Sequence, residues 1–256
     1  MSIKVSTENN VTTIAIDRIE KKNALTGAMY AAMAAALGAA SIDAKIRAVL
    51  ITGRPEIFTA GNEMQDFLAA AENTAGRETM PAQAFMHALI DCEKPVIAAV
   101  NGAAIGIGTT MLLHCDLVYL ADDAKLVMPF VNLGIVPEFA SSLELPQRIG
   151  HVKAAQHLLL GDPIGAQEAL AMGLANAVLP ASAVLSHARA IAERFNFLPP
   201  EAVRETKKLM RRANKEAVRA AIDIELNIFR ECLGSREAQE AIQAFLQKRK
   251  ADFSRF

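Results

Sequence analysis

A short apolar segment that runs directly into a glycine-rich turn is the feature that most constrains the fold of this chain. Residues 94–100 read Lys-Pro-Val-Ile-Ala-Ala-Val and are typical of a buried strand. The turn that follows, residues 101–108, holds three glycines, which let a backbone approach a ligand closely. We expect a helix over residues 108–114, whose first N–H groups point at such a ligand. The segment therefore predicts an anion or oxyanion site, with a tight turn that only packs as the alternative.

The rest of the chain places this turn within an α/β architecture. Strand patterns lie mainly in the first half, at residues 11–16, 48–52, 116–120 and 125–128. A helix is predicted from Thr26, and apolar residues recur at helical spacing in six later windows: residues 154–160, 166–172, 183–195, 202–210, 217–229 and 236–248. This order predicts an α/β core over residues 1–195, followed by a helical region over residues 196–256 that belongs to the same functional unit.

Composition excludes several classes of protein. The chain has 27 Lys and Arg against 28 Asp and Glu, and this balance argues against nucleic-acid binding. Its three cysteines lie far apart, and the N-terminus lacks the apolar run of a signal peptide. No window reaches the length of a membrane span, so we expect a cytoplasmic protein without membrane contact. His114, Cys115 and Asp116 are adjacent and diverge at a helix end, so we expect them to pack rather than to bind a metal.

Several motifs, taken in order along the chain, give a more specific expectation. They are Glu-Lys-Lys-Asn-Ala-Leu at residues 20–25, Phe-Thr-Ala-Gly-Asn-Glu-Met at 58–64, the segment 94–108, Cys-Asp-Leu-Val-Tyr at 115–119 and Gly-Ile-Val-Pro-Glu at 134–138. The glycine-rich turn alone looks like that of short-chain dehydrogenases, but no Tyr-x-x-x-Lys motif follows it. The order and spacing of all the motifs resemble the crotonase (enoyl-CoA hydratase/isomerase) superfamily over essentially the whole length.

The resemblance implies a crotonase-like spiral of ββα units whose C-terminal helical region mediates trimerisation, in a homotrimer or a dimer of trimers. It implies an acyl-CoA thioester substrate, with coenzyme A as part of that substrate and no metal or other cofactor. The backbone N–H groups of Asn62 and Ile107 are implied as donors to the thioester oxygen. Such donors stabilise the enolate that forms when the α-carbon loses its proton.

Two departures from the family pattern concern the acids of hydratases. Hydratases of this family carry one glutamate on the helix after the glycine loop, where this chain has Thr110. They carry a second after the next strand, where this chain has Phe130. Adding water to a double bond needs a base for the water and an acid for the carbon, work usually shared by two carboxylates. A standard hydratase is therefore disfavoured.

Glu138 is the acid that remains in a suitable place. Its segment looks like the one that carries the single catalytic glutamate of peroxisomal-type Δ3,Δ2-enoyl-CoA isomerases. Apolar neighbours such as Ile135 and Phe139 would raise its pKa toward neutrality, which suits a group that moves one proton. The alternative is that Glu138 caps a helix that starts near Ser141.

The resemblance also implies which residues surround the substrate. Lys21 borders the CoA phosphates, or else belongs to a solvated basic turn; Met64 lines an acyl tunnel, or else only packs. Residues 70–81 are small and polar, as in a lid or a disordered loop. The residues expected at the substrate are Lys21, Ala24, Ala60, Gly61, Met64, Gly106 and Phe130.

These observations predict an enoyl-CoA isomerase in which Glu138 moves the proton and Asn62 and Ile107 hold the thioester oxygen. An enoyl-CoA hydratase, or another lyase of the crotonase type, is the first alternative. A non-catalytic protein that binds acyl-CoA is the second, because it would fit the loss of both hydratase glutamates.

Overall fold

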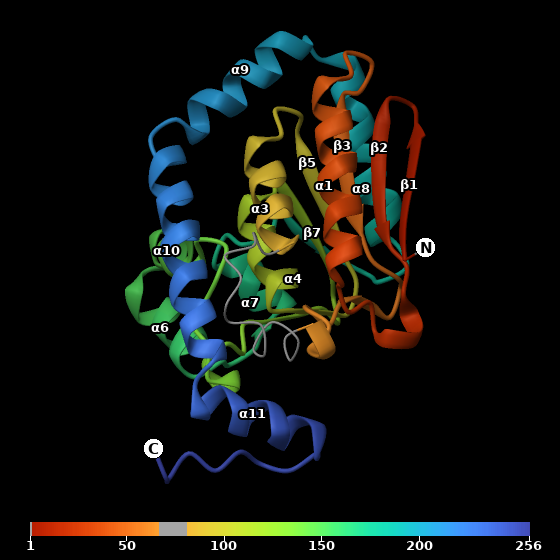
Figure 1. Ribbon diagram of the computed structural model, residues 1–256. Coiled ribbons are helices and arrows are strands. Elements are labelled where there is room, and N and C mark those ends of the chain that lie inside the picture. The colour runs from red at the N-terminus through yellow and green to blue at the C-terminus, as the bar shows by residue number, and fades with distance from the viewer. Residues whose placement is uncertain (1, 67–80) are drawn as a thin grey trace.

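The computed structural model describes residues 2–66 and 81–256, which form two β-sheets and a set of covering helices (Figure 1). The strands are β1 (Ile3–Glu8), β2 (Val11–Ile16), β3 (Ala48–Thr52), β4 (Ile57–Thr59), β5 (Val96–Val100), β6 (Ala103–Ile105), β7 (Leu117–Ala121), β8 (Lys125–Val127), β9 (Ile164–Gly165) and β10 (Ala177–Leu179). The expected lid at residues 70–81 lies, except for Pro81, outside the described residues.

The helices make up most of the second half of the chain. The α-helices are α1 (Gly27–Ile42), α3 (Pro81–Asp91), α4 (Ile107–Thr110), α5 (Ser141–Ile149), α6 (His151–Leu159), α7 (Ala166–Ala171), α8 (Val184–Arg194), α9 (Pro200–Arg211), α10 (Lys215–Leu233) and α11 (Arg236–Leu246). Short 3₁₀ helices are η1 (Ile19–Lys21), η2 (Met111–His114), η3 (Val131–Leu133) and η4 (Phe195–Phe197). The predicted α/β core with later helices is confirmed.

The larger sheet has the strand order β1-β2-β3-β5-β7-β10, and its strands are parallel apart from the β1–β2 hairpin. Every residue of β3 and β5 is buried. Helices α1 and α3 pack against each other in front of this sheet, and α8 lies behind it (Figure 1). A parallel sheet covered on both faces requires such uniformly apolar strands, which is why these two were readable from sequence.

The smaller sheet has the order β4-β6-β8-β9 and was not predicted. Each of its first three strands follows a strand of the larger sheet after a short turn, so β3, β5 and β7 lead into β4, β6 and β8. The predicted helix over residues 108–114 corresponds to α4 and η2, but the expectation that a single glycine turn leads into it is wrong. The chain turns at Gly102, forms β6, and turns again at Gly106 before α4 and then η2.

The C-terminal helices extend away from the sheets. In Figure 1, α9 crosses above the core and α10 descends along its side, where it packs on α5. Helices α9 and α10 expose large apolar side chains, among them Leu209, Met210 and Ile224. Their expected role in trimerisation remains a prediction. Of the helices described, none is long and apolar enough to cross a membrane.

Candidate active site

Glu138 lies in the segment between η3 and α5 and is only 2% exposed. The hydroxyl of Thr110, on α4, donates a hydrogen bond of 2.6 Å to Oε1 of Glu138. The other carboxyl oxygen, Oε2, is buried and has no hydrogen-bond partner within the described part of the chain. A buried polar atom without a partner is costly in a purely structural role, so this oxygen is a candidate for reacting with a substrate.

The surroundings of Glu138 raise its pKa to about 8. Burial is the largest cause, because it disfavours the charged carboxylate, and the nearby carboxyl of Glu225 acts in the same direction. The hydrogen bond from Thr110 opposes both, because it favours the charged form. A carboxyl group with a pKa near neutrality can both take up and release a proton, as the sequence analysis expected of Glu138.

Thr110 and Phe130, where the resemblance leads us to expect the glutamates of a hydratase, are both buried. Thr110 is fully buried and is the residue that contacts Glu138. Phe130 is 4% exposed, and its ring faces Gly106, where an added Cβ would lie 4.0 Å from the ring edge. One hydratase position is thus occupied by a hydroxyl that supports the remaining acid, and the other by an apolar ring.

The turns that carry Asn62 and Ile107 touch each other. Gly61 has a φ of +84°, and a Cβ added there would lie 2.7 Å from the carbonyl oxygen of Ile105. Only glycine can therefore bring the chain before Asn62 so close to the chain before Ile107. Gly106, between Ile105 and Ile107, also has a positive φ, of +56°.

In the part of the chain that the structure describes, no hydrogen bond of these turns uses the N–H group of Asn62 or of Ile107. Asn62 forms an isolated parallel β-bridge with Leu25, and the hydrogen bonds of this bridge involve the residues on either side of Asn62. The Leu25 N–H donates to the Gly61 carbonyl, and the Glu63 N–H donates to the Leu25 carbonyl. Ile107 is the first residue of α4, where N–H groups have no partner within the helix. Two N–H groups on adjoining turns are the arrangement that an oxyanion hole needs.

The side chain of Asn62 is held separately from its main chain. The Tyr30 hydroxyl, on α1, donates a hydrogen bond to Oδ1 of Asn62. Burial, followed by the charge of Glu138, raises the pKa of Tyr30 well above its usual value, so the hydroxyl stays neutral and remains a donor. The sequence analysis did not identify Tyr30, because its partner lies 32 residues further along the chain.

The residues expected around the substrate fall into two groups. Ala24, Ala60 and Gly61 lie together, because the Ala60 N–H donates to the Lys22 carbonyl and the Leu25 N–H donates to the Gly61 carbonyl. Lys21 is exposed at the end of η1 on the same turn, and Met64 is partly buried against the core. Their contacts with a substrate remain predictions.

The segment after Glu138 has an unusual backbone. Phe139 and Ala140 both have positive φ values, of 58° and 56°, a conformation that costs about 1–2 kcal/mol for each residue that is not glycine. Helix α5 begins directly afterwards, with Ala140 at its N-cap and no side-chain cap from that residue. The alternative role of Glu138 as the cap is wrong. The carboxylate of Glu225, on α10, instead accepts hydrogen bonds from the N–H groups of Ala140 and Ser142.

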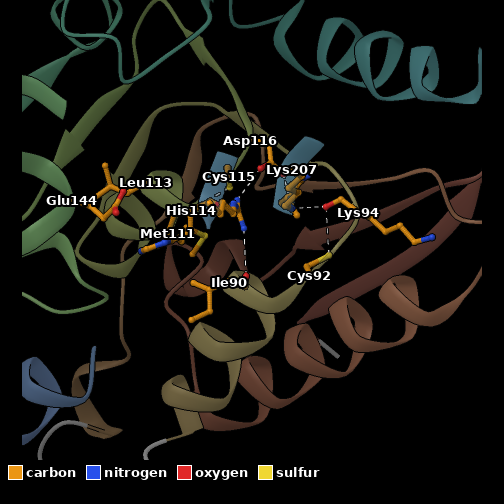
Figure 2. Close-up of polar contacts among 12 residues, drawn as sticks. Ile90, Cys92, Lys94, Met111, Leu113, His114, Cys115, Asp116, Glu144 and Lys207 are labelled. Carbon is orange, nitrogen blue, oxygen red and sulfur yellow. Dashed lines mark hydrogen bonds and ion pairs between the residues drawn. The ribbon is translucent and has the colours of Figure 1, made fainter. Parts of the chain in front are cut away.

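A charged cluster fastens α9 to the ends of the central strands. Asp116 accepts a 2.7 Å contact from Lys207 of α9 (Figure 2). It also accepts a 2.8 Å contact from Arg211 of α9 and a 2.7 Å bond from the Val96 N–H. Arg211 also donates to the His114 carbonyl. His114 and Asp116 thus contribute to packing between elements, as the sequence led us to expect. Within residues 2–66 and 81–256, no three His, Cys, Asp or Glu side chains gather in a way that could hold a metal ion.

A cavity of about 920 Å³ lies beside this cluster, between α9, α10 and the core. Its lining contains both signs of charge, and Glu138 does not contribute to it. The cavity is therefore separate from the candidate active site. Representative lining residues are Cys92, His114, Arg148, Lys207, Met210 and Lys215.

Comparison with known proteins gives relatives over the whole chain. A family model described as enoyl-CoA hydratase/isomerase matches residues 6–255. "Enoyl-CoA delta isomerase 2" of Rattus norvegicus is 35% identical over 96% of this chain, which spans 64% of that protein's length. "2,3-dehydroadipyl-CoA hydratase" of Escherichia coli (strain K12) is 33% identical, with 97% of each chain covered. The solved structure of Pseudomonas aeruginosa OdaA is 51% identical, has a TM-score of 0.92 and covers 96% of this chain and 98% of its own.

Proposed function

Because the chain belongs to the enoyl-CoA hydratase/isomerase family, we propose that it is a Δ3,Δ2-enoyl-CoA isomerase that uses Glu138 as its single base. The observation that supports this choice most directly is that Glu138 is a buried acid in contact with Thr110. Glu138 is buried, with Oε1 held by Thr110 and Oε2 without a hydrogen-bond partner among the described residues. The resemblance places the two acids of hydratases at the positions of Thr110 and Phe130. One acid of this kind suffices to move a proton between two carbons.

The proposed reaction has two proton transfers. The ionised carboxylate takes a proton from C2 of a 3-enoyl-CoA, and the electron pair of that bond moves to give a dienolate. Its negative charge rests on the thioester oxygen, held by the N–H groups of Asn62 and Ile107. The protonated Glu138 then returns the proton to C4, which leaves the double bond between C2 and C3. Removing one such N–H donor typically costs about 10²–10³ in rate.

The direct test compares wild type with Glu138→Gln on a 3-enoyl-CoA, following the appearance of the conjugated 2-enoyl thioester. Gln keeps the shape of the side chain and cannot take up the proton, so kcat should fall by about 10²–10⁴. A substrate deuterated at C2 sharpens the test, because a single base should deliver part of the label to C4 in ordinary water. Unchanged turnover by Glu138→Gln would exclude this mechanism.

Two further assays separate the alternatives. Hydratase relatives such as the E. coli protein make water addition to a 2-enoyl-CoA the first comparison. Faster hydration than isomerisation would identify a hydratase that uses an unusual acid. Acyl-CoA binding with no turnover of either substrate would identify a binding protein instead.

A further inference from the structure

We propose that Glu225 and His114 are positioning residues that hold the Phe139–Ala140 peptide from both sides and thereby fix the direction of the Glu138 side chain. This inference rests on the proposed function, since it takes Glu138 as the base. Neither residue is near Glu138 in sequence: Glu225 lies on α10 and His114 at the end of η2. Both contact the Phe139–Ala140 peptide bond, which begins one residue after Glu138.

One side of the peptide is held by His114. Its Nε2 lies 2.7 Å from the Phe139 carbonyl oxygen, and the imidazole ring stacks on the Phe139 ring at 4.1 Å between centroids. A carbonyl can only accept, so this nitrogen carries the hydrogen and donates it. His114 is 5% exposed, and burial lowers its pKa to about 3, so the ring is neutral under ordinary conditions.

The other side is held by Glu225. Its Oε2 accepts a 2.5 Å hydrogen bond from the Ala140 N–H, and its Oε1 accepts bonds from the N–H and the hydroxyl of Ser142. The carboxylate therefore satisfies the first N–H groups of α5 in place of a local cap. Glu225 shares the buried face of α10 with Ile222, Leu226 and Phe229. A carboxylate on an apolar helix face requires such partners.

The conformation of the peptide explains why it needs to be held. Phe139 and Ala140 are both left-handed, an arrangement that side chains disfavour and that persists only where the surroundings impose it. Without the hydrogen bonds to His114 and Glu225, the peptide could rotate toward ordinary backbone conformations. Glu138, one residue earlier, would then turn with it. A displacement of about 1 Å at a catalytic group can cost about 10²-fold in rate.

Charged and titratable groups near Glu138 and His114 act on the pKa values of these two residues, so the experiment must separate an effect on pKa from an effect on position. Glu225 of α10 and Tyr30 of α1 are titratable groups that lie near Glu138. The charge of Glu225 raises the pKa of Glu138. His114 is near the guanidinium groups of Arg148 and Arg211, which act on its pKa in the same direction as burial does. A variant at Glu225 that removes the charge should therefore alter both the position and the pKa of Glu138.

The experiment measures kcat, KM and the pH profile for Glu225→Gln, with Glu231→Gln as a matched control on an exposed position of the same helix. Gln can accept from only one of the two N–H groups, so kcat should fall about tenfold to hundredfold while KM changes little. Loss of the charge should also move the acid limb of the pH profile to lower pH. The control should leave kcat and the profile unchanged.

Variants at His114 provide a second, independent measurement. His114→Gln keeps an N–H donor and should retain most of kcat, whereas His114→Leu removes the donor and should lower kcat as Glu225→Gln does. Circular dichroism and denaturant midpoints confirm that each variant is folded. Hydrogen exchange at the Ala140 and Ser142 amides should accelerate in Glu225→Gln and stay unchanged in Glu231→Gln.

The outcomes distinguish this inference from the proposed function. If Glu138→Gln abolishes turnover but folded Glu225→Gln and His114→Leu retain full kcat and an unshifted pH profile, the positioning role is wrong and the isomerase proposal stands. If Glu138→Gln retains turnover, the proposed function is wrong, and the positioning role toward catalysis is wrong with it. A fall in kcat that Glu231→Gln reproduces would also overturn the positioning role.

Discussion

The Thr110 hydroxyl donates to Oε1 of Glu138 across 2.6 Å, whereas Oε2 of the same carboxyl group has no partner within residues 2–66 and 81–256. The held oxygen fixes the plane of the carboxyl group. The other oxygen, Oε2, is the atom that could take up a proton and release it again. Thr110 thus holds the carboxyl group of Glu138 in place.

Replacing Thr110 tests the value of this bond. Thr110→Val keeps the shape and removes the donor, so the pKa of Glu138 should rise above about 8 and less of it is ionised near neutrality. The rate of 3-enoyl-CoA isomerisation at pH 7 should fall about tenfold or more, with partial recovery at higher pH. Thr110→Ser keeps the hydroxyl and should stay close to wild type. Equal rates for the Val and Ser variants would contradict this role.

The pH dependence of kcat/KM should reflect the titration of Glu138. The base must be ionised to take the proton, so kcat/KM should rise with pH and level off above about 8. Tyr30 has a strongly raised pKa and should not contribute in this range. Rates measured from pH 6 to 9.5 test this. A profile that is flat across this range would show that Glu138 does not limit the reaction.

Stability should depend on pH through two buried groups with opposite signs. The pKa of Glu138 is raised from 4.5 to about 8 in the folded protein, so its contribution is fully present below 4.5 and is lost as pH rises through 8. The pKa of His114 is lowered from 6.5 to about 3, so stability is lost as pH falls from 6.5 toward 3. Each slope is at most about 1.4 kcal/mol per pH unit.

Denaturant unfolding of wild type, Glu138→Gln and His114→Gln separates these two contributions. The stability of wild type relative to Glu138→Gln should decline between pH 4.5 and 8. Relative to His114→Gln, it should rise between pH 3 and 6.5, and between 4.5 and 6.5 the two effects should oppose each other in wild type. Parallel curves for all three proteins would be inconsistent with these shifts.

Gly61→Ala and Gly106→Ala form a matched pair at the two adjoining turns. Both positions have positive φ, so each substitution should cost about 1 kcal/mol in backbone strain. At Gly61 the new Cβ would also lie 2.7 Å from the Ile105 carbonyl oxygen, whereas at Gly106 the nearest atom of the described residues is on the Phe130 ring, 4.0 Å away. Overpacking should add about 1–3 kcal/mol for Gly61→Ala alone.

Unfolding free energies and isomerisation rates measure both effects. Gly61→Ala should separate the Asn62 and Ile107 turns and should lower kcat even where the protein remains folded. If Gly106→Ala proves at least as destabilising as Gly61→Ala, the close approach of the two turns is not as described.

The elements that sequence patterns predicted are those whose own residues determine them. The windows at residues 183–195, 202–210 and 236–248 correspond to α8, α9 and α11, because one apolar stripe is enough to define each helix. Strands β4 and β6 were missed because each has three residues, and their pairing joins segments far apart in the chain. So short a strand carries little pattern, although β8, which is equally short, was predicted within residues 125–128.

The candidate site also contains residues that the sequence indicated and contacts that it did not. Glu138, Asn62 and Ile107 were each identified from a short local motif. The contacts of Glu225 and His114 with the Phe139–Ala140 peptide span 85 and 25 residues, and no local pattern reports them. One signal was available: Glu225 interrupts the apolar stripe of α10, and a carboxylate there implies a buried partner.

The dependence of the Glu138 turn on α10 has a consequence for the order in which the molecule matures. The strands β3 and β5, and Glu138 itself, all precede α10 in the chain, so they leave the ribosome before Glu225 is made. Until α10 docks, the Ala140 N–H lacks the Glu225 acceptor that it has in the folded protein. In pulse-labelling during refolding, the Ala140 amide should become protected together with α10 and after the central strands. Catalytic competence would then be the last property that the newly made chain acquires.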